Sequence, residues 1–226
     1  VNLSPQQSAV LSWVRDGSGS CNVIARAGTG KTTLLMEVAK VITGTGFMGA
    51  FNKSIADEFK SRLAAQGSRH VTGATLHSAG NAACRRANPQ ASRDYVDARK
   101  VYGIARELPS IGWDKVLLKA VCDTVSFGKQ AVLGVGSDYK DPANWQAIID
   151  EYDIAEDIPK ACKLEVFIDF CEQVYEKSLK TCDRVIDFDD MLLAPLYYHW
   201  ALPKYDWVMM DEAQDTNKAR RLIAFA

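Results

Sequence analysis

The amino-acid sequence predicts an α/β fold, in which a parallel sheet carries helices on both faces and an all-helical segment is inserted. Short apolar runs alternate with helical segments up to residue 85 and again from residue 185, an order typical of a parallel sheet. Between residues 86 and 184 the strand signals fade and apolar side chains recur at helical spacing. A glycine-rich segment between the first apolar run and a helix gives the third observation, a strand–loop–helix order.

The start of the chain has clear local signals. Pro5–Val14 is predicted to be a helix, because Ser4 is a favourable N-cap and Pro5 suits the first helical position. Cys21–Ala25 is a short apolar run that we expect to form a buried strand. A helix is expected to follow over Lys31–Val41.

Two further strands are predicted at Thr45–Phe51 and Val71–Thr75. A helix over Ile55–Ala65 separates them, and another begins near His77. Because strands that alternate with helices pair in parallel, we expect helices to cover both faces of the sheet.

The middle of the chain is predicted to be helical and the end to return to the sheet. A helix is expected from Asp189 to about Tyr198, and an apolar strand over Tyr205–Met210. We therefore predict three parts: residues 1–85 form the first part of the sheet domain, residues 86–184 the inserted helical subdomain, and residues 185–226 the continuation of the sheet domain.

Composition and charge exclude several classes of protein. Of the 226 residues, 47% are hydrophobic and 24% are charged, as in folded globular proteins. No apolar run reaches the roughly 20 residues of a membrane span, and the N-terminus has no secretory signal. We therefore expect no membrane association. The expected location is the cytoplasm, at the nucleoid, or the nucleus if the source is a eukaryote.

Cysteine spacing and charge distribution narrow the choice further. The six cysteines form no CxxC pair, so they lack the spacing of a zinc site. The net charge is −1, but basic residues concentrate between Phe51 and Arg86, whereas the stretch from Asp141 to Glu172 is acidic. This distribution favours a cationic face in the first stretch, with an ordinary solvated helix surface as the alternative.

The segment from Ala25 to Thr32 has the composition of a loop that cradles phosphates, although its first position is Ala rather than Gly. Its glycines let the backbone curl so that N–H groups point at the phosphates, and the next helix directs its positive N-terminus there. Lys31 would supply a charge to the γ-phosphate, and the Thr32 hydroxyl would bind Mg²⁺. We predict that ATP contacts Ala27, Gly28, Thr29, Gly30, Lys31, Thr32 and Thr33. A glycine-rich turn with a surface lysine is the alternative.

Two adjacent acidic residues, Asp211 and Glu212, follow the last predicted strand. Acidic residues at the carboxyl end of a strand can hold a metal ion and polarise a water molecule. Asp211 is expected to hold Mg²⁺, and Glu212 to act as the general base toward the attacking water. Such a pair alone is also typical of a helix cap, but together with the loop it predicts ATP hydrolysis.

Five stretches of the sequence resemble the UvrD/Rep-like superfamily 1 DNA helicases, in the order in which that family has them. They are Leu3–Val10, Phe51–Glu58, Thr75–Ser78, Ile186–Asp190 and Asp211–Asn217. The resemblance implies the first RecA-like motor domain of a P-loop NTPase with an inserted helical subdomain. It also implies an ATP-dependent helicase that moves 3′→5′ on single-stranded DNA.

The resemblance also implies roles for residues at the nucleotide site. A glutamine in the first stretch would read the adenine edge; Gln6 matches the family spacing, and Gln7 is the alternative. Gln214 and Asp215 would couple hydrolysis to DNA. Thr33 stands where relatives often carry an arginine that packs on adenine, so base recognition is expected to be looser here.

The DNA contacts are expected in the second and third stretches. Phe51 would stack on a base, in a segment with Asn52 and Lys53, while Thr75 and His77 would contact the DNA backbone. Stacking on an aromatic ring does not depend on sequence, as a translocase requires. The alternatives are a core aromatic for Phe51 and a locally satisfied helix-start residue for His77.

Family members continue with a second RecA-like motor domain that supplies an arginine across the cleft, and this domain is the implied partner of the chain. We therefore expect weak or no ATPase activity and no unwinding from these residues alone. Two other functions remain open: a superfamily 2 or other P-loop NTPase acting on RNA, and a nucleotide-binding module without motor activity.

Overall fold

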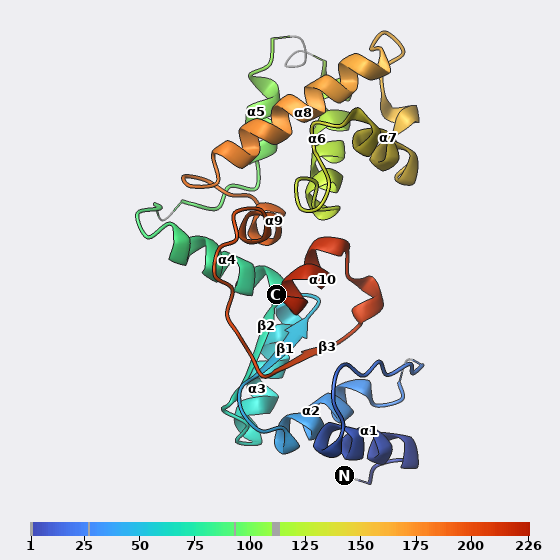
Figure 1. The fold of residues 1–226 in the computed structure, drawn as a ribbon, viewed down its shortest axis with the longest axis vertical. Helices are drawn as coiled ribbons and strands as arrows, with labels where there is room; N and C mark the ends of the chain where they lie inside the picture. Colours follow the sequence, from blue (N-terminus) through green and yellow to red (C-terminus); the bar gives the residue numbers. More distant parts are fainter. Residues whose placement is uncertain (1, 27, 93, 110–113) are drawn as a thin grey trace. The chain divides into compact units, whose positions relative to one another are not determined.

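The computed structural model describes residues 2–26, 28–92, 94–109 and 114–226 and shows an α/β fold with a small parallel sheet (Figure 1). The chain forms two compact units. The sheet unit comprises Val1–Leu76 and Pro203–Thr216, and the helical unit comprises His77–Leu202 and Asn217–Ala226. The predicted boundaries at residues 85/86 and 184/185 stay a prediction.

The sheet is built from β1 (Gly46–Ala50), β2 (Val71–Thr75) and β3 (Trp207–Met210) in the order β2-β1-β3. Both pairings are parallel, with Gly46 opposite Val71 on one side and opposite Trp207 on the other. This confirms the parallel arrangement and the three corresponding strand predictions to within two residues. Since the strands are parallel, the residues that follow them lie at one edge of the sheet.

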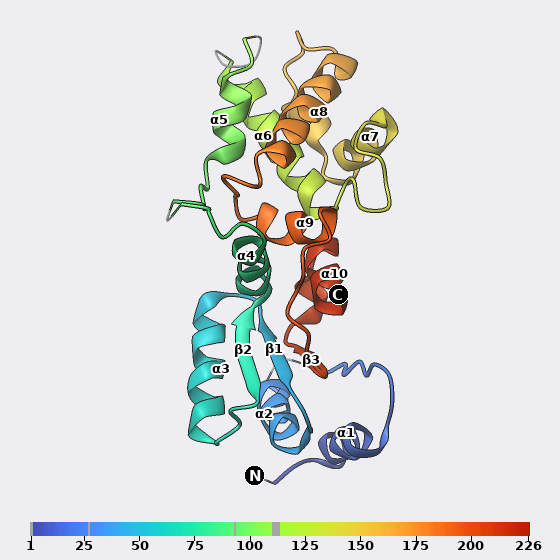
Figure 2. The ribbon, with the colours of Figure 1, turned by 60° about the vertical axis from the view of Figure 1, so that its left-hand side comes forward.

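Among the described residues, the sheet unit contains the α-helices α1 (Pro5–Asp16), α2 (Lys31–Val41) and α3 (Lys53–Ala65). The predicted start of α1 is confirmed, because the Ser4 hydroxyl accepts the Gln7 N–H and the Gln7 side chain accepts the Ser4 N–H. Figure 2 shows α3 alongside β2, where it packs on the sheet.

Helices α2 and α3 share a core with one face of the sheet. Phe59 of α3 and Met48 of β1 are fully buried in this core, and α2 contributes four further buried residues, Leu34, Met36, Val38 and Ala39. The approach is close at Gly73, where an added Cβ would lie 2.9 Å from the Phe59 Cβ. A glycine in β2 therefore lets α3 pack tightly on the sheet.

The strand predicted at Cys21–Ala25 is wrong. These residues have no regular secondary structure, and the side chains of Val23 and Ile24 are 40% and 93% exposed. An apolar run indicates a tendency to pair, but a strand requires a neighbouring strand to satisfy its backbone groups. Among the described residues, this segment pairs with none.

The helical unit contains the long amphipathic helices predicted for the middle of the chain. Its helices are α4 (Leu76–Ala87), α5 (Lys100–Arg106), α6 (Lys115–Gln130), α7 (Pro142–Glu151), α8 (Leu164–Lys180), α9 (Asp190–Tyr197) and α10 (Lys218–Phe225). A close crossing of α4 and α9 depends on Gly80, because an added Cβ would lie 1.9 Å from the Met191 carbonyl oxygen. Across the described part of the chain, no helix is both long and apolar enough to span a bilayer.

Four charged side chains, which we call the buried charge cluster, lie inside the helical unit: Lys100, Lys129, Asp187 and Asp190. Lys129 Nζ is 2.6 Å from Asp187 Oδ2 and 2.7 Å from Asp190 Oδ1, the second contact lacking hydrogen-bond geometry. Lys100 Nζ donates to Asp190 Oδ2 at 2.6 Å and to the Ser178 carbonyl at 2.7 Å. The cluster is neutral in sum and joins α5, α6, α8 and the start of α9.

Candidate nucleotide-binding site

The loop before α2 adopts a curled backbone that requires glycine. Gly28 and Gly30 have φ of 76° and 82°, the left-handed region that side-chain-bearing residues rarely enter. Between them, the Thr29 hydroxyl donates to the Arg26 carbonyl at 2.7 Å and closes the turn. The predicted contact at Ala27 lies outside the described residues.

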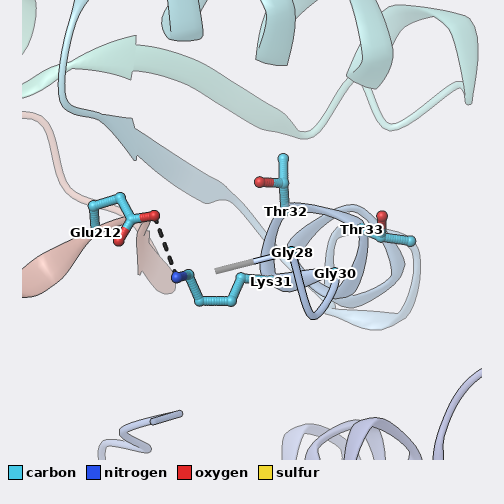
Figure 3. A pocket seen from close by; sticks show the side chains of 6 residues that line it. All are labelled: Gly28, Gly30, Lys31, Thr32, Thr33 and Glu212. Atoms are coloured by element: carbon cyan, nitrogen blue, oxygen red, sulfur yellow. Dashed lines mark ion pairs between the residues drawn. The ribbon is translucent and has the colours of Figure 1, made fainter. Parts of the chain in front are cut away.

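Helix α2 presents its N-terminus to a pocket of about 350 Å³. Its N-cap is Gly30, which has no side chain to bond the first-turn amides, so these N–H groups can bind an anion. Figure 3 shows the residues that line the pocket: Gly28, Gly30, Lys31, Thr32, Thr33 and Glu212.

Asp211 and Glu212 follow β3 directly; Glu212 lines this pocket, and Asp211 contacts Thr32, which also lines it. The Thr32 hydroxyl donates to Asp211 Oδ2 at 3.4 Å, and Lys31 Nζ lies 3.3 Å from Glu212 Oε1. These contacts join residues that are about 180 positions apart in the sequence. The structure thus brings together the two acidic residues and the two loop residues that sequence reasoning assigned to one site.

Glu212 is held by its backbone as well as by its neighbours. Its φ of 47° is in the left-handed region, which is unusual for a non-glycine residue and is often found at functional sites. Gln214 Nε2 donates to Glu212 Oε2 at 2.7 Å. This hydrogen bond, followed by that from Lys31, holds the pKa of Glu212 below its ordinary value, so the carboxylate is ionised at neutral pH.

The residues at the pocket fit a nucleotide phosphate with a divalent cation. The first-turn amides of α2, which Gly30 leaves without a side-chain cap, and Lys31 provide donors and positive charge, and the Thr32 hydroxyl and Asp211 carboxylate provide two neighbouring oxygens. Magnesium commonly takes one or two protein oxygens and completes its shell with phosphate and water. The lack of any three-residue His/Cys/Asp/Glu group in the described chain is therefore compatible with a Mg²⁺ site here.

The two candidate adenine-reading glutamines differ in their surroundings. Gln7 Nε2 donates to the Thr29 carbonyl at 3.3 Å, and its Oε1 accepts the Ser4 N–H at 2.9 Å. Gln6 is exposed on the first turn of α1. The Gln7 amide thus supports the phosphate loop, which sequence reasoning did not anticipate, and the assignment of the adenine-reading residue stays a prediction.

The residues predicted to contact DNA follow β1 and β2. Phe51 is 47% exposed directly after β1, and Thr75 ends β2 opposite Ala50. Asn52 caps α3 by accepting the Ile55 N–H at 2.9 Å, and Lys53 is exposed at the first position of that helix. The order β2-β1-β3 therefore places Thr75, Phe51 and the acidic pair along one edge of the sheet.

Helix α4 begins one residue before His77, in agreement with the predicted helix start, and the DNA contact of His77 stays a prediction. His77 lies in the helical unit at the second position of α4 and is partly buried. Burial and then the positive charge of Arg220 lower its pKa to about 4. His77 is consequently neutral at physiological pH, so any phosphate contact would be a single N–H hydrogen bond rather than an ion pair.

Sequence reasoning missed the roles of Lys100 and Lys129 in the buried charge cluster. A signal for Lys129 was present, because it continues the apolar stripe Leu118, Val121 and Val125 of α6 at a spacing of three or four residues. A lysine on the buried stripe of a helix indicates an acidic partner inside the fold.

Among the curated proteins compared with the chain, none matches it. The sequence model of the UvrD/REP helicase N-terminal domain matches residues 3–224, which is nearly the whole chain. This match spans the phosphate loop, the acidic pair and the helices between them. The chain therefore belongs to the UvrD/REP helicase family and corresponds to its N-terminal domain.

Proposed function

We propose that this chain is the N-terminal, RecA-like motor domain of an ATP-dependent helicase that moves 3′→5′ on single-stranded DNA. The observation that carries the proposal is the meeting of Lys31 and Thr32 with Asp211 and Glu212 at one pocket. Family membership supports a helicase and ATP-binding role. Polarity and the choice of DNA rest on the resemblance. We also propose that the sheet is RecA-like and carries helices on both faces.

Each residue at the pocket has a proposed task. The amides at the start of α2 and Lys31 would bind the β- and γ-phosphates, and Thr32 and Asp211 would hold Mg²⁺, which would neutralise phosphate charge when bound. Glu212, ionised at neutral pH, accepts a proton from the attacking water. Gln214 orients Glu212 through its 2.7 Å hydrogen bond.

Turnover by this chain alone is expected to be slow. Of the described residues that line the pocket, Lys31 is the one cation. Phosphoryl transfer by P-loop enzymes is commonly accelerated by an additional arginine that stabilises the transition state. We propose that a second motor domain supplies this charge.

Single-stranded DNA is proposed to contact the edge of the sheet at Phe51, with Lys53 at the N-terminus of α3. An exposed aromatic ring and a helix N-terminus suit a base and a phosphate, respectively. Neither group reads sequence, as a translocase requires.

Nucleotide binding is tested with a fluorescent ADP analogue and Mg²⁺. Lys31→Met is expected to weaken binding by about tenfold or more, because a charge-assisted contact to phosphate is lost. Lys40→Met is the matched control, since this exposed lysine of the same helix pairs with Glu37. Equal affinities of the two variants would contradict the site.

The nucleic-acid ligand is tested by fluorescence anisotropy with DNA and RNA oligonucleotides of one sequence. Phe51→Ala is expected to weaken binding to single-stranded DNA by about 1–3 kcal/mol. The slope of affinity against salt reports the number of phosphate contacts. A preference for RNA would instead favour the alternative of an RNA-dependent NTPase, and nucleotide binding without either ligand would favour a module without motor activity.

A further inference from the structure

A continuous chain of side-chain hydrogen bonds runs through the helical unit from α10 to α9. Asn217 Nδ2 donates to Gln130 Oε1 at 3.2 Å, and Gln130 Nε2 donates to Ser126 Oγ at 3.2 Å. The Ser126 hydroxyl then donates to Asp189 Oδ2 at 2.5 Å. We call Asn217, Gln130, Ser126 and Asp189 the polar chain.

The hydrogen bonds of the polar chain all run in the same donor-to-acceptor direction. The Arg220 N–H donates to Asn217 Oδ1 at 2.9 Å, so every group along the chain accepts from the α10 side and donates toward α9. The last acceptor is the carboxylate of Asp189. Hydrogen bonds aligned in this way polarise one another, and a charged terminal acceptor strengthens the series.

One end of the polar chain is covalently joined to the acidic segment of the nucleotide site. Asn217 directly follows Thr216, whose hydroxyl donates to the Ala213 carbonyl at 2.6 Å. Only four positions separate Asn217 from Ala213, which follows Glu212. The link between the nucleotide site and the polar chain is therefore a short backbone segment that contains the turn Ala213–Asp215.

The other end is anchored in the core of the helical unit. Asp189 lies between Asp187 and Asp190 of the buried charge cluster. Those two residues fix the same turn, because each accepts the backbone N–H of the other, at 2.8 and 3.1 Å. The turn at the start of α9 is thus held by ion pairs on one side and by the polar chain on the other.

From this arrangement we infer that Gln130 and Ser126 are coupling residues, which transmit the state of the nucleotide site to the turn Asp187–Asp190. Gln130 has the central part, because its amide accepts from Asn217 and donates to Ser126. The inference rests on the proposed function, since it requires a nucleotide at the pocket.

The test is hydrogen exchange of the 226-residue chain with and without saturating ADP and Mg²⁺. Nucleotide binding is expected to slow exchange locally at residues 28–34 and remotely at residues 187–192, each by about threefold or more. Gln130→Met keeps the length of the side chain but removes both hydrogen bonds. In this variant the local slowing should persist and the remote slowing should disappear.

Two further variants make the result specific. Ser126→Ala breaks the polar chain at a second point and should give the same loss. Gln173→Met is the matched control, because Gln173 of α8 donates to Asp169 on the same exposed face; it should behave like the unmodified chain. The melting temperature and ADP affinity of each variant show whether a loss is local to the polar chain.

The outcomes separate the inference from the proposed function. Remote slowing that survives in Gln130→Met and Ser126→Ala would overturn the inference, as would its absence in the unmodified chain despite local slowing at the loop. If ADP and Mg²⁺ cause no local slowing either, the proposed nucleotide site itself is wrong and the inference falls with it.

Discussion

Replacing Lys129 with methionine is expected to destabilise the helical unit strongly. Lys129 is completely buried and lies 2.6 Å from Asp187 Oδ2 and 2.7 Å from Asp190 Oδ1. Burial opposes its charge, but the attraction of Asp190 and Asp187 outweighs burial and raises the pKa of Lys129 above its ordinary value. Lys129→Met keeps most of the side-chain volume, but the buried carboxylates of Asp187 and Asp190 then have Lys100 as the one remaining cation of the buried charge cluster.

The magnitude follows from the chemistry of buried ion pairs. Removing one partner typically costs about 3–5 kcal/mol, because the remaining charge stays desolvated without its counter-ion. With a urea dependence of about 2 kcal/mol per molar, the unfolding midpoint should fall by roughly 1.5–2.5 M. That is a large part of the stability of a typical domain.

Urea unfolding followed by far-ultraviolet circular dichroism measures this loss. Lys119→Met is the matched control, because Lys119 lies on the same helix but is exposed and pairs with Asp123; we expect a negligible change. The double variant Lys129→Met/Asp187→Asn restores a neutral cluster, so it should recover about 1–3 kcal/mol of the loss. A loss below about 1 kcal/mol in Lys129→Met, or no recovery in the double variant, would refute the reasoning.

Three further predictions test other features of the chain. Burial, followed by the charges of Asp187 and Asp190, raises the pKa of Asp189 to about 6 against the opposing Ser126 hydrogen bond and Lys129. The stabilisation that comes with its protonated form is complete below pH 4 and is lost as the pH rises through 6. In urea titrations, Asp189→Asn should therefore stabilise the chain by about 1–2 kcal/mol at pH 7.5 but not at pH 4. Equal effects at both pH values would contradict the raised pKa. Gly80→Ala should lower the free energy of unfolding by about 1–3 kcal/mol, because the added Cβ meets the Met191 carbonyl. Gly103→Ala should stabilise α5 by about 1 kcal/mol, because its Cβ would meet no described atom within 4 Å. Thermal melts that rank the two variants alike would disprove the packing argument. Gln6→Ala should reduce the preference for ATP over GTP without lowering the melting temperature. Gln7→Ala should lower the melting temperature, because it removes the contacts with Ser4 and Thr29. A loss of ATP preference in Gln7→Ala and not in Gln6→Ala, measured by nucleotide competition, would assign adenine reading to Gln7.

The sequence was a good guide wherever the determining interaction is local. Helix α1 begins at Pro5 because Ser4 and Gln7 cap it, and these residues are three positions apart. The phosphate loop requires a left-handed backbone at Gly28 and Gly30, which the glycines themselves indicate. Such features depend on residue type and spacing, and both can be read without a structure.

Prediction failed where the deciding partner is distant in the sequence. Cys21–Ala25 has the composition of a strand, but composition does not identify a neighbouring strand. Lys129 and Asp187 are 58 positions apart, and nothing in either local stretch specifies the pairing. The lowered pKa of His77 likewise depends first on burial and then on the charge of Arg220, and both arise from the packing of the helical unit.

The ion pair between Lys31 and Glu212 joins the residue proposed to bind phosphate to the proposed general base. Both side chains are partly exposed, so solvent screens the ion pair and makes it weak. A polyphosphate carries more charge than one carboxylate and can also accept the first-turn amides of α2, so it should displace Glu212 from Lys31 readily. Gln214 would still hold Glu212 after this exchange, because it bonds Oε2 rather than the Oε1 atom that faces Lys31. The carboxylate would then remain oriented at the pocket with one oxygen released for a water molecule.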